Sequence, residues 1–244
     1  MRNIKLILQY DGSNYHGFQI QPSVETVQGV LERTVKEITG ESVRVYGCSR
    51  TDAGVHAYRY VAGFKTGTPI PPDKISVVMN NHLPDDIRVI SSYEEKEDFH
   101  PRFSCVSKTY RYIINTDETS DVFMRNYEWQ VKKELDIRAM EEACKYIVGE
   151  HDFRSFMTSG PDMETTVRNV FSLHVKKEGN RIIIYINADG YLYNMVRIIT
   201  GTLCLVGEGR ISPENVGEII AKKNREYAGP TAPPQGLYLY EIFY

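Results

Sequence analysis

The chain has 244 residues, 41% hydrophobic and 25% charged, as expected for an ordinary globular protein of one or two domains. This composition excludes disorder over the bulk of the chain. Its 29 Lys and Arg residues against 32 Asp and Glu give a net charge of -3, which argues against a uniformly basic surface that coats nucleic acid. A local basic patch remains compatible with this charge. The acidic run Glu94 to Asp98 accounts for the whole imbalance.

Membrane, disulfide and metal signals are missing from the sequence. No stretch reaches the ~18 consecutive apolar residues of a membrane span, and Asp11 interrupts the opening segment, so we expect a cytoplasmic protein that does not enter a membrane. The six histidines lack metal-ligand spacing, and we expect no metal site. Wide spacing without a CxxC pair predicts free thiols for the cysteines, which are Cys48, Cys105, Cys144 and Cys204.

Hydrophobic periodicity predicts strands and helices in alternation through the first half. Thr26 can cap an amphipathic helix that Gly40 ends, and Pro71-Pro72 introduces a second helix. The order β, α, β, β, α, β is typical of an antiparallel sheet with helices on one face, the split βαβ arrangement. In chain order the predicted elements are a strand over 4–9, a helix over 27–38, strands over 43–46 and 60–64, a helix over 73–80 and a strand over 87–91.

The second half repeats this order of elements. Asp136 can cap a helix that stops at Gly149, and Ser212-Pro213 can open another. The predicted elements are strands over 110–115 and 127–131, a helix from 137, a hairpin over 170–176 and 181–188, a long apolar segment over 191–206 and a closing strand over 237–243. We therefore predict an α+β protein with an N-terminal domain over 1–105 and a C-terminal domain over 106–244.

The string GCSRTDAGVHA, residues 47–57, lacks the periodicity of a strand or helix and is predicted to be a loop. Arg50, Thr51 and Asp52 place a cation, a hydroxyl and a carboxylate within three positions, and Gly54 permits a tight turn or close approach to a ligand. An Asx-turn beside a surface Arg explains the same residues equally well. The loop is thus a candidate site with a structural alternative.

Arg197 interrupts the apolar segment NMVRIITGTLCLV. A buried guanidinium needs a carboxylate and further acceptors, and the segment contains no acid, so a partner would come from elsewhere in the chain. A catalytic Asp on a loop is one such partner. The alternative is a surface Arg whose stem covers apolar neighbours.

Aromatic and basic residues interleave in FHPRF, residues 99–103, and in KTYRY, residues 108–112. Such surfaces can stack RNA bases. In a strand, however, Tyr110 shares a face with Lys108 and Tyr112, so about half of the pattern is explained by core packing.

Several of these strings together resemble the tRNA pseudouridine synthases of the TruA type. The matching motifs run in that family's order over nearly the whole chain. Phe18 stands where the family commonly has Trp, and Ser49 where Gly is frequent. The motifs are YDGSNYHGFQIQP (10–22), TVQGVLE (26–32), SRTDAGVHA (49–57), FHPRFSC followed by SKTYRY (99–112), HDFRSF (151–156) and GYLYNMVRIITGTL (190–203).

The resemblance implies a pseudouridine synthase fold, in which two ferredoxin-like α+β halves share a central antiparallel sheet with a cleft between them. It also implies a homodimer that binds tRNA and isomerises uridine to pseudouridine at positions 38, 39 and 40 of the anticodon stem-loop. No metal or organic cofactor is implied. We expect the acidic run Glu94 to Asp98 to face away from the RNA.

The resemblance also implies roles for individual residues. Asp52 corresponds to the family's essential aspartate, Tyr110 to its active-site tyrosine and Arg197 to the arginine that pairs with the aspartate. Arg50 would hold the flipped base out of the stack. The expected phosphate contacts are Arg102, Lys108 and Arg111.

Two other classes of protein are compatible with parts of this sequence. A non-catalytic RNA-binding module would use the aromatic residues but gives no reason for Asp52 beside Arg50. A glycoside or nucleoside hydrolase would need a second carboxylate at about 5 to 9.5 Å from Asp52. Asp11 and Asp152 are the candidates, and each lies where a turn or helix end predicts a structural role.

Overall fold

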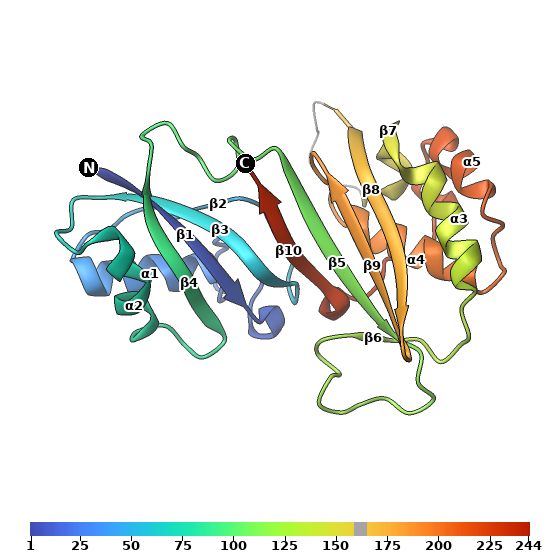
Figure 1. Ribbon diagram of the computed structural model, residues 1–244, viewed down its shortest axis with the longest axis horizontal. Helices are drawn as coiled ribbons and strands as arrows, with labels where there is room; N and C mark the ends of the chain where they lie inside the picture. The colour runs from blue at the N-terminus through green and yellow to red at the C-terminus, as the bar shows by residue number, and fades with distance from the viewer. Residues whose placement is uncertain (159–164) are drawn as a thin grey trace. The chain divides into compact units, whose positions relative to one another are not determined.

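The computed structural model describes residues 1–158 and 165–244, which divide into two compact units. Unit 1 comprises Met1–Val106 and Tyr238–Tyr244, and unit 2 comprises Ser107–Leu237. The closing residues 238–244, which the sequence grouped with the second half, thus belong to unit 1. Figure 1 shows the elements of both units in chain order.

The sheet of unit 1 has the strand order of a split βαβ fold. β1 lies between β4 and β3 and is antiparallel to both, and β2 pairs antiparallel with β3. β10 pairs with β3 in parallel at Tyr238 and Leu239. The strands are β1 (Arg2–Tyr10), β2 (Tyr46–Gly47), β3 (His56–Thr66), β4 (Ile87–Glu95) and β10 (Leu237–Phe243).

The helices of unit 1 begin and end where the sequence indicates. α1 (Val27–Thr39) starts at Thr26, whose hydroxyl accepts the Gly29 N–H, and ends at Gly40 with a left-handed φ of 74°. A short 3-10 turn at 72–74 leads into α2 (Ile75–Asn80), which packs on β4 and α1. Both caps of α1 are confirmed.

The alternation of buried and more exposed side chains along β1 identifies the strand face that lies in the core of unit 1. Ile4, Leu6 and Leu8 are completely buried, whereas Gln9 is exposed. Leu31 and Val35 of α1 are also completely buried. The buried face of the strand and the apolar stripe of the helix therefore form one hydrophobic layer between sheet and helix.

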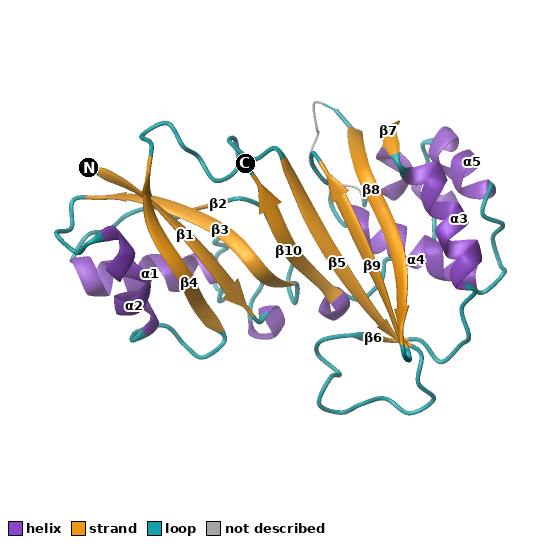
Figure 2. Ribbon diagram, viewed as in Figure 1, coloured by secondary structure: helices purple, strands orange, loops and turns teal. Residues whose placement is uncertain are grey.

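The sheet of unit 2 is antiparallel in the order β5-β9-β8-β7. The hairpin of β8 and β9 turns at Gly179 and Asn180, as predicted, and a short β6 pairs in parallel with β5. Its strands, drawn as orange arrows in Figure 2, are β5 (Ser107–Asn115), β6 (Trp129–Gln130), β7 (Gly149–Asp152), β8 (Val167–Glu178) and β9 (Arg181–Ala188).

Three helices pack together in unit 2. α3 (Ile137–Ile147) contacts β8, α4 (Met195–Gly207) and α5 (Asn215–Lys222). Asp136 caps α3 by accepting N–H groups from its first turn. The long apolar segment predicted over 191–206 is thus mainly a buried helix, in which every residue of α4 except Arg197 and Leu205 is buried.

Three local predictions differ from the structure. The strand expected over 43–46 is reduced to two residues at 46–47, and the strand expected over 127–131 to two residues at 129–130. β7 was not predicted, because its four residues, GEHD, are polar and carry no alternation. The α+β class is confirmed.

Candidate active site

The loop between β2 and β3, residues 48–55, is attached to the N-terminal segment that follows β1. The hydroxyls of Tyr10 and Thr51 are hydrogen-bonded at 2.7 Å. The Phe18 N–H donates to the Thr51 carbonyl at 3.2 Å. Thr51 is therefore held through both its side chain and its backbone, one residue before Asp52.

The following turn is held in the same way. The Val55 N–H donates to the Asp52 carbonyl and the Gly54 N–H to the Tyr15 carbonyl, both at 3.2 Å. Gly54 has a φ of +74°, a conformation that favours glycine. The Tyr15 hydroxyl in turn donates to Asp86 at 2.5 Å, and burial together with this carboxylate raises the pKa of Tyr15. Asp52 thus lies at the start of a fixed turn.

Two glycines allow the N-terminal segment to approach the loop. A Cβ on Gly12 would lie 2.1 Å from the Val55 carbonyl oxygen, and one on Gly17 would lie 2.4 Å from that of Thr51. The Gly12 N–H donates to Nδ1 of the buried His56 at 3.0 Å. This role of His56 carries no signal in the sequence, where a lone histidine at a strand start has no diagnostic spacing.

Within this loop, Arg50 is exposed and Asp52 is half-buried. The loop therefore presents a cation and a carboxylate from a backbone that hydrogen bonds hold on both sides. A carboxylate held in this way can act as a nucleophile or as a base.

Tyr110 lies on β5 of unit 2, opposite Ile186 of β9. Its ring is 6% exposed and packs edge-on against Tyr191, with ring centroids 4.9 Å apart. The Tyr191 hydroxyl lies 2.8 Å from the Lys108 carbonyl oxygen and 2.9 Å from that of Ile186. Tyr191 therefore fixes the ring of Tyr110 against the strand pair.

Arg197 lies in the first turn of α4 and is half-buried. Its Nε donates to the Ala232 carbonyl and its Nη1 to Oδ1 of Asn194, both at 2.7 Å. Asn194 adopts a left-handed φ of 61° and also donates from Nδ2 to Thr158 at 3.0 Å. Asn194 is a positioning residue that sequence analysis missed, since an Asn before a helix reads as an ordinary cap.

Substitution of Asn194 separates the contribution of its left-handed backbone to stability from the contribution of its side chain to turnover. We expect Asn194→Gly to keep the fold, because glycine tolerates the left-handed backbone, but to lower turnover about tenfold by removing the Arg197 acceptor. Asn194→Ala should show the same loss of turnover and about 1 kcal/mol lower free energy of unfolding. Urea unfolding and steady-state kinetics test both variants, and normal turnover in Asn194→Gly would show that Arg197 needs no such acceptor.

The two candidate second acids have structural roles. Asp11 caps a 3-10 turn by accepting the N–H and hydroxyl of Ser13 at 2.9 and 2.6 Å. Asp152 accepts the Thr166 hydroxyl at 2.6 Å and pairs with Lys223 at 3.2 Å. Burial opposes ionisation of Asp152, but these contacts outweigh it and hold the pKa of Asp152 below its usual range. An acid already ionised at neutral pH is unsuited to protonate a leaving group, which disfavours the hydrolase reading.

The lowered pKa of Asp152 predicts a pH-dependent contribution to stability. Because the folded state favours the charged form, the stabilisation is complete above the ordinary Asp pKa and is lost as pH falls through the folded pKa. We expect Asp152→Asn to lower the free energy of unfolding by about 1 kcal/mol at neutral pH. The difference from wild type should shrink below about pH 4. Urea titrations across this range test it, and a pH-independent difference would contradict the assignment.

Two of the cysteines, Cys144 and Cys204, are unsuitable as nucleophiles. None of the four cysteines, all within the described residues, forms a disulfide, as predicted. Burial raises the pKa of both Cys144 and Cys204 to about 12, so their thiols stay protonated at neutral pH. In the described residues no three His, Cys, Asp or Glu side chains gather as metal ligands, and no helix there has the length and apolarity to cross a membrane.

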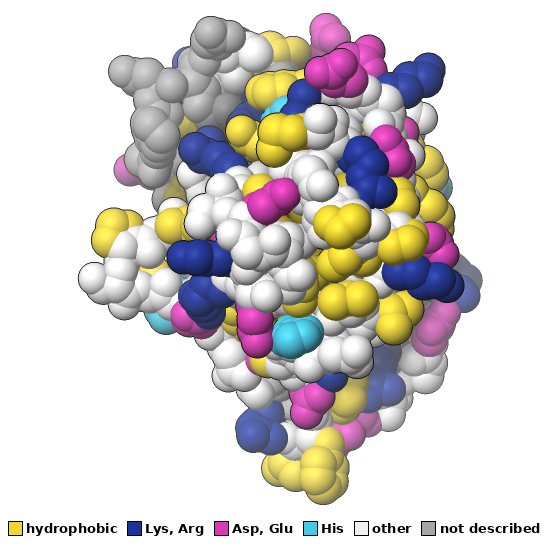
Figure 3. Space-filling view, turned by 90° about the vertical axis from the view of Figure 1, so that its left-hand side faces the viewer, with side chains coloured by type: hydrophobic (Ala, Val, Ile, Leu, Met, Phe, Trp, Pro, Cys, Tyr) yellow, Lys and Arg dark blue, Asp and Glu magenta, His cyan; other side chains and the backbone are white. Residues whose placement is uncertain are grey.

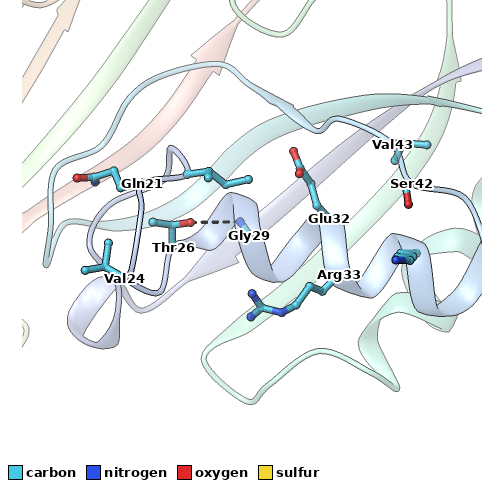
Figure 4. Close-up of a pocket in the computed structure, with 10 residues that line it drawn as sticks. Gln21, Val24, Thr26, Gly29, Glu32, Arg33, Ser42 and Val43 are labelled. Atoms are coloured by element: carbon cyan, nitrogen blue, oxygen red, sulfur yellow. Dashed lines mark hydrogen bonds between the residues drawn. The ribbon is translucent and has the colours of Figure 1, made fainter.

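A groove beside α1 contains none of the predicted site residues (Figure 4). Two of its charged side chains have partners, since Glu32 accepts the Val45 N–H at 3.0 Å and Arg33 pairs with Glu25. Figure 3 shows one face of the molecule, on which Lys and Arg are interspersed with Asp and Glu. Neither feature identifies a further reactive site.

The predicted site residues are divided between the units. Arg50, Asp52 and Arg102 belong to unit 1, whereas Lys108, Tyr110, Arg111 and Arg197 belong to unit 2. Lys108 and Arg111 are half-buried on β5, and Arg102 is exposed on the turn at 101–104. Each unit therefore holds its own set of predicted site residues.

Comparisons with known proteins relate this α+β chain to an enzyme family. A family model described as tRNA pseudouridine synthase matches residues 6–104 and 143–244. The tRNA pseudouridine synthase A 2 of Clostridium perfringens is 48% identical over 244 residues, covering 100% of both chains. The tRNA pseudouridine synthase A of Thermoanaerobacter sp. is 47% identical with the same coverage. The solved structure of a Cbf5-Nop10-Gar1 complex gives a TM-score of 0.39 at 12% identity, over 97% of this chain and 48% of that chain, too low to support a conclusion.

The chain belongs to the tRNA pseudouridine synthase family. The family resemblance found in the sequence is confirmed, and with it the enzyme class, an isomerase. Asp52 and Arg197 lie within the matched stretches, whereas Tyr110 lies between them, in a part of the chain covered by the full-length relatives.

Proposed function

We propose that this chain isomerises uridine to pseudouridine at positions 38, 39 and 40 of the tRNA anticodon stem-loop, with Asp52 as the catalytic carboxylate. The observation that carries the proposal is the loop at 48–55, which hydrogen bonds fix on both sides of Asp52, in a chain 48% identical over its full length to a tRNA pseudouridine synthase A. The enzyme acts in the cytoplasm as a homodimer and needs no metal or organic cofactor.

The reaction rearranges bonds without adding or removing atoms overall. The N1–C1′ glycosidic bond breaks, the uracil rotates while it is held, and a C5–C1′ bond forms. The proton on C5 is then lost, and N1 gains one. Asp52 starts this sequence as a nucleophile at C1′ or C6, or as the base that removes the 2′ proton.

The other site residues support the carboxylate and the flipped base. The guanidinium of Arg197 pairs with Asp52 and keeps it ionised. The ring of Tyr110, fixed by Tyr191, stacks on the extruded uracil, and its hydroxyl takes part in removal of the C5 proton. Arg50, exposed two residues before Asp52, fills the space that the flipped nucleotide leaves.

Cationic side chains outside the reacting centre position the tRNA. Arg102, Lys108 and Arg111 contact phosphates, which fix the register of the RNA without reading its sequence. The acidic run Glu94 to Asp98 faces away from the RNA. Within it, Glu95 pairs with Lys5 at 3.1 Å, which supports a structural role for this carboxylate.

Mapping the product tests the proposed positions. Unmodified tRNA transcripts with uridine at 38, 39 or 40 are incubated with the enzyme, and pseudouridine is located by nuclease digestion and mass spectrometry. Transcripts with cytidine at all three positions are the matched control. Pseudouridine confined to the three positions supports the proposal, whereas pseudouridine at other positions only would contradict it.

A further inference from the structure

A short turn, residues 99–104, carries part of the aromatic and basic interleaving noted in the sequence. The His100 N–H donates to the Ser104 hydroxyl at 3.0 Å, and the Ser104 N–H donates to the His100 carbonyl at 2.9 Å. Nδ1 of His100 accepts the N–H groups of Arg102 and Phe103 at 3.1 and 3.3 Å. The turn therefore holds its side chains on a defined backbone.

The turn is also fixed to the sheet of unit 1. The Tyr244 hydroxyl donates to the Pro101 carbonyl at 2.8 Å. A Cβ on Gly63 of β3 would lie 3.1 Å from Cγ of Pro101, so the proline ring lies directly on the strand. Gly63 pairs with Tyr46 of β2, which places the turn beside that short strand.

The turn and β2 together form a continuous series of rings and cations. Tyr46 and His100 have ring centroids 5.2 Å apart, and His100 and Phe103 have theirs 4.4 Å apart. The guanidinium of Arg44 lies 5.7 Å from the Tyr46 ring, and that of Arg102 lies 5.7 Å from the Phe103 ring. We call these five residues the aromatic platform.

The aromatic platform is open to solvent and positively charged. Phe103 is 77% exposed and Tyr46 is 44% exposed, which core packing does not explain. Arg44 and Arg102 are exposed, and neither forms an ion pair with a carboxylate of the described residues. Burial and the charge of Arg102 lower the pKa of His100, so this ring is neutral at physiological pH.

From this arrangement we infer that the aromatic platform is an RNA subsite that stacks an unpaired base of the tRNA other than the reacting uridine. Exposed rings of Phe103 and Tyr46 offer faces for a base, and the flanking guanidiniums of Arg44 and Arg102 suit the adjacent phosphates. Two acids of the run that precedes the turn are engaged by lysines, Glu95 by Lys5 at 3.1 Å and Glu97 by Lys65 at 3.8 Å, so the guanidiniums of the platform stay available for phosphates. The inference rests on the proposed function, because it assumes a tRNA substrate.

Binding of an unmodified tRNA transcript tests the platform. Stacking of a base on one ring lowers the dissociation constant by about 5- to 150-fold. Phe103→Ala and Tyr46→Ala should therefore each raise the Kd and KM by a factor within this range and leave kcat unchanged. Tyr93→Ala, a matched control on β4 whose side chain is 50% exposed, should change neither. Arg102→Ala should reduce the salt dependence of binding by about one unit of slope, whereas Phe103→Ala should not.

The outcomes separate the platform from the proposed function. Unchanged tRNA affinity in both Phe103→Ala and Tyr46→Ala overturns the platform, and pseudouridine formation by the wild type leaves the proposed function standing. A change of oligomeric state in these variants at unchanged affinity also overturns it, by identifying a protein contact. Weaker binding in both variants, with no pseudouridine formed by the wild type, supports the platform and refutes the function. Thermal unfolding confirms that each variant is folded.

Discussion

Asp52→Asn is expected to lower turnover on uridine-containing tRNA by at least about 10³-fold while the protein folds normally and binds tRNA. The amide is nearly isosteric with the carboxylate, so the hydrogen bonds that hold Thr51 and the Asp52 carbonyl are retained. It carries no negative charge, and it can act neither as a nucleophile nor as a base at neutral pH. Single-turnover kinetics at saturating enzyme measure the loss without a contribution from binding.

The matched control for this variant is Asp73→Asn. Asp73 is an acid of the same unit whose side chain is 68% exposed and pairs only with its neighbour Lys74 among the described residues. An exposed pair of this kind contributes little, so turnover and stability should both be unchanged. Turnover of Asp52→Asn within about tenfold of the wild type would show that another group starts the reaction.

Gly201→Ala is expected to destabilise the protein by about 3 kcal/mol or more. A Cβ on Gly201 of α4 would lie 1.8 Å from the Pro230 carbonyl oxygen, a backbone atom that cannot move aside alone. The segment 229–232 therefore crosses α4 at close range. Two hydrogen bonds join them at this crossing: the Gly229 N–H donates to the Thr202 hydroxyl at 2.9 Å, and the Ala232 N–H donates to the Arg197 carbonyl at 3.1 Å. Displacing the segment would also move the Ala232 carbonyl that holds Arg197.

Gly29→Ala provides the comparison for this substitution. Gly29 lies inside α1, and its Cβ would meet only side-chain atoms, the nearest at 3.2 Å. Alanine is the better helix former by about 1 kcal/mol, so this variant should be as stable as the wild type or more stable. Equal stabilities of Gly201→Ala and Gly29→Ala in urea would contradict the described backbone crossing.

The fold was largely predictable because its elements carry local signals. Thr26 and Gly40 delimit α1 and Asp136 starts α3 through ordinary capping chemistry, and alternation along β1 identifies its buried face. β7 was missed because its four polar residues carry no alternation, although they pair with β8. The grouping of 238–244 with unit 1 is a long-range pairing, which local periodicity cannot contain.

The candidate site was less accessible to sequence reasoning than the fold. The chemical nature of Asp52 and Arg197 is visible in the sequence, because a polar loop and a cation in an apolar segment are both unusual. The residues that hold them are not visible in this way. Asn194 acts through a left-handed backbone and two side-chain hydrogen bonds, and Tyr10 through a hydroxyl pair across forty-one positions of sequence.

Release of tritium from C5-labelled uridine in unmodified tRNA tests the central claim most directly. Isomerisation to pseudouridine must remove the C5 hydrogen, whereas RNA binding and hydrolysis of the glycosidic bond both leave it in place. We predict that the wild type releases tritium in proportion to the pseudouridine formed and that Asp52→Asn releases none above background. Binding of the labelled tRNA by the wild type without tritium release would contradict the account.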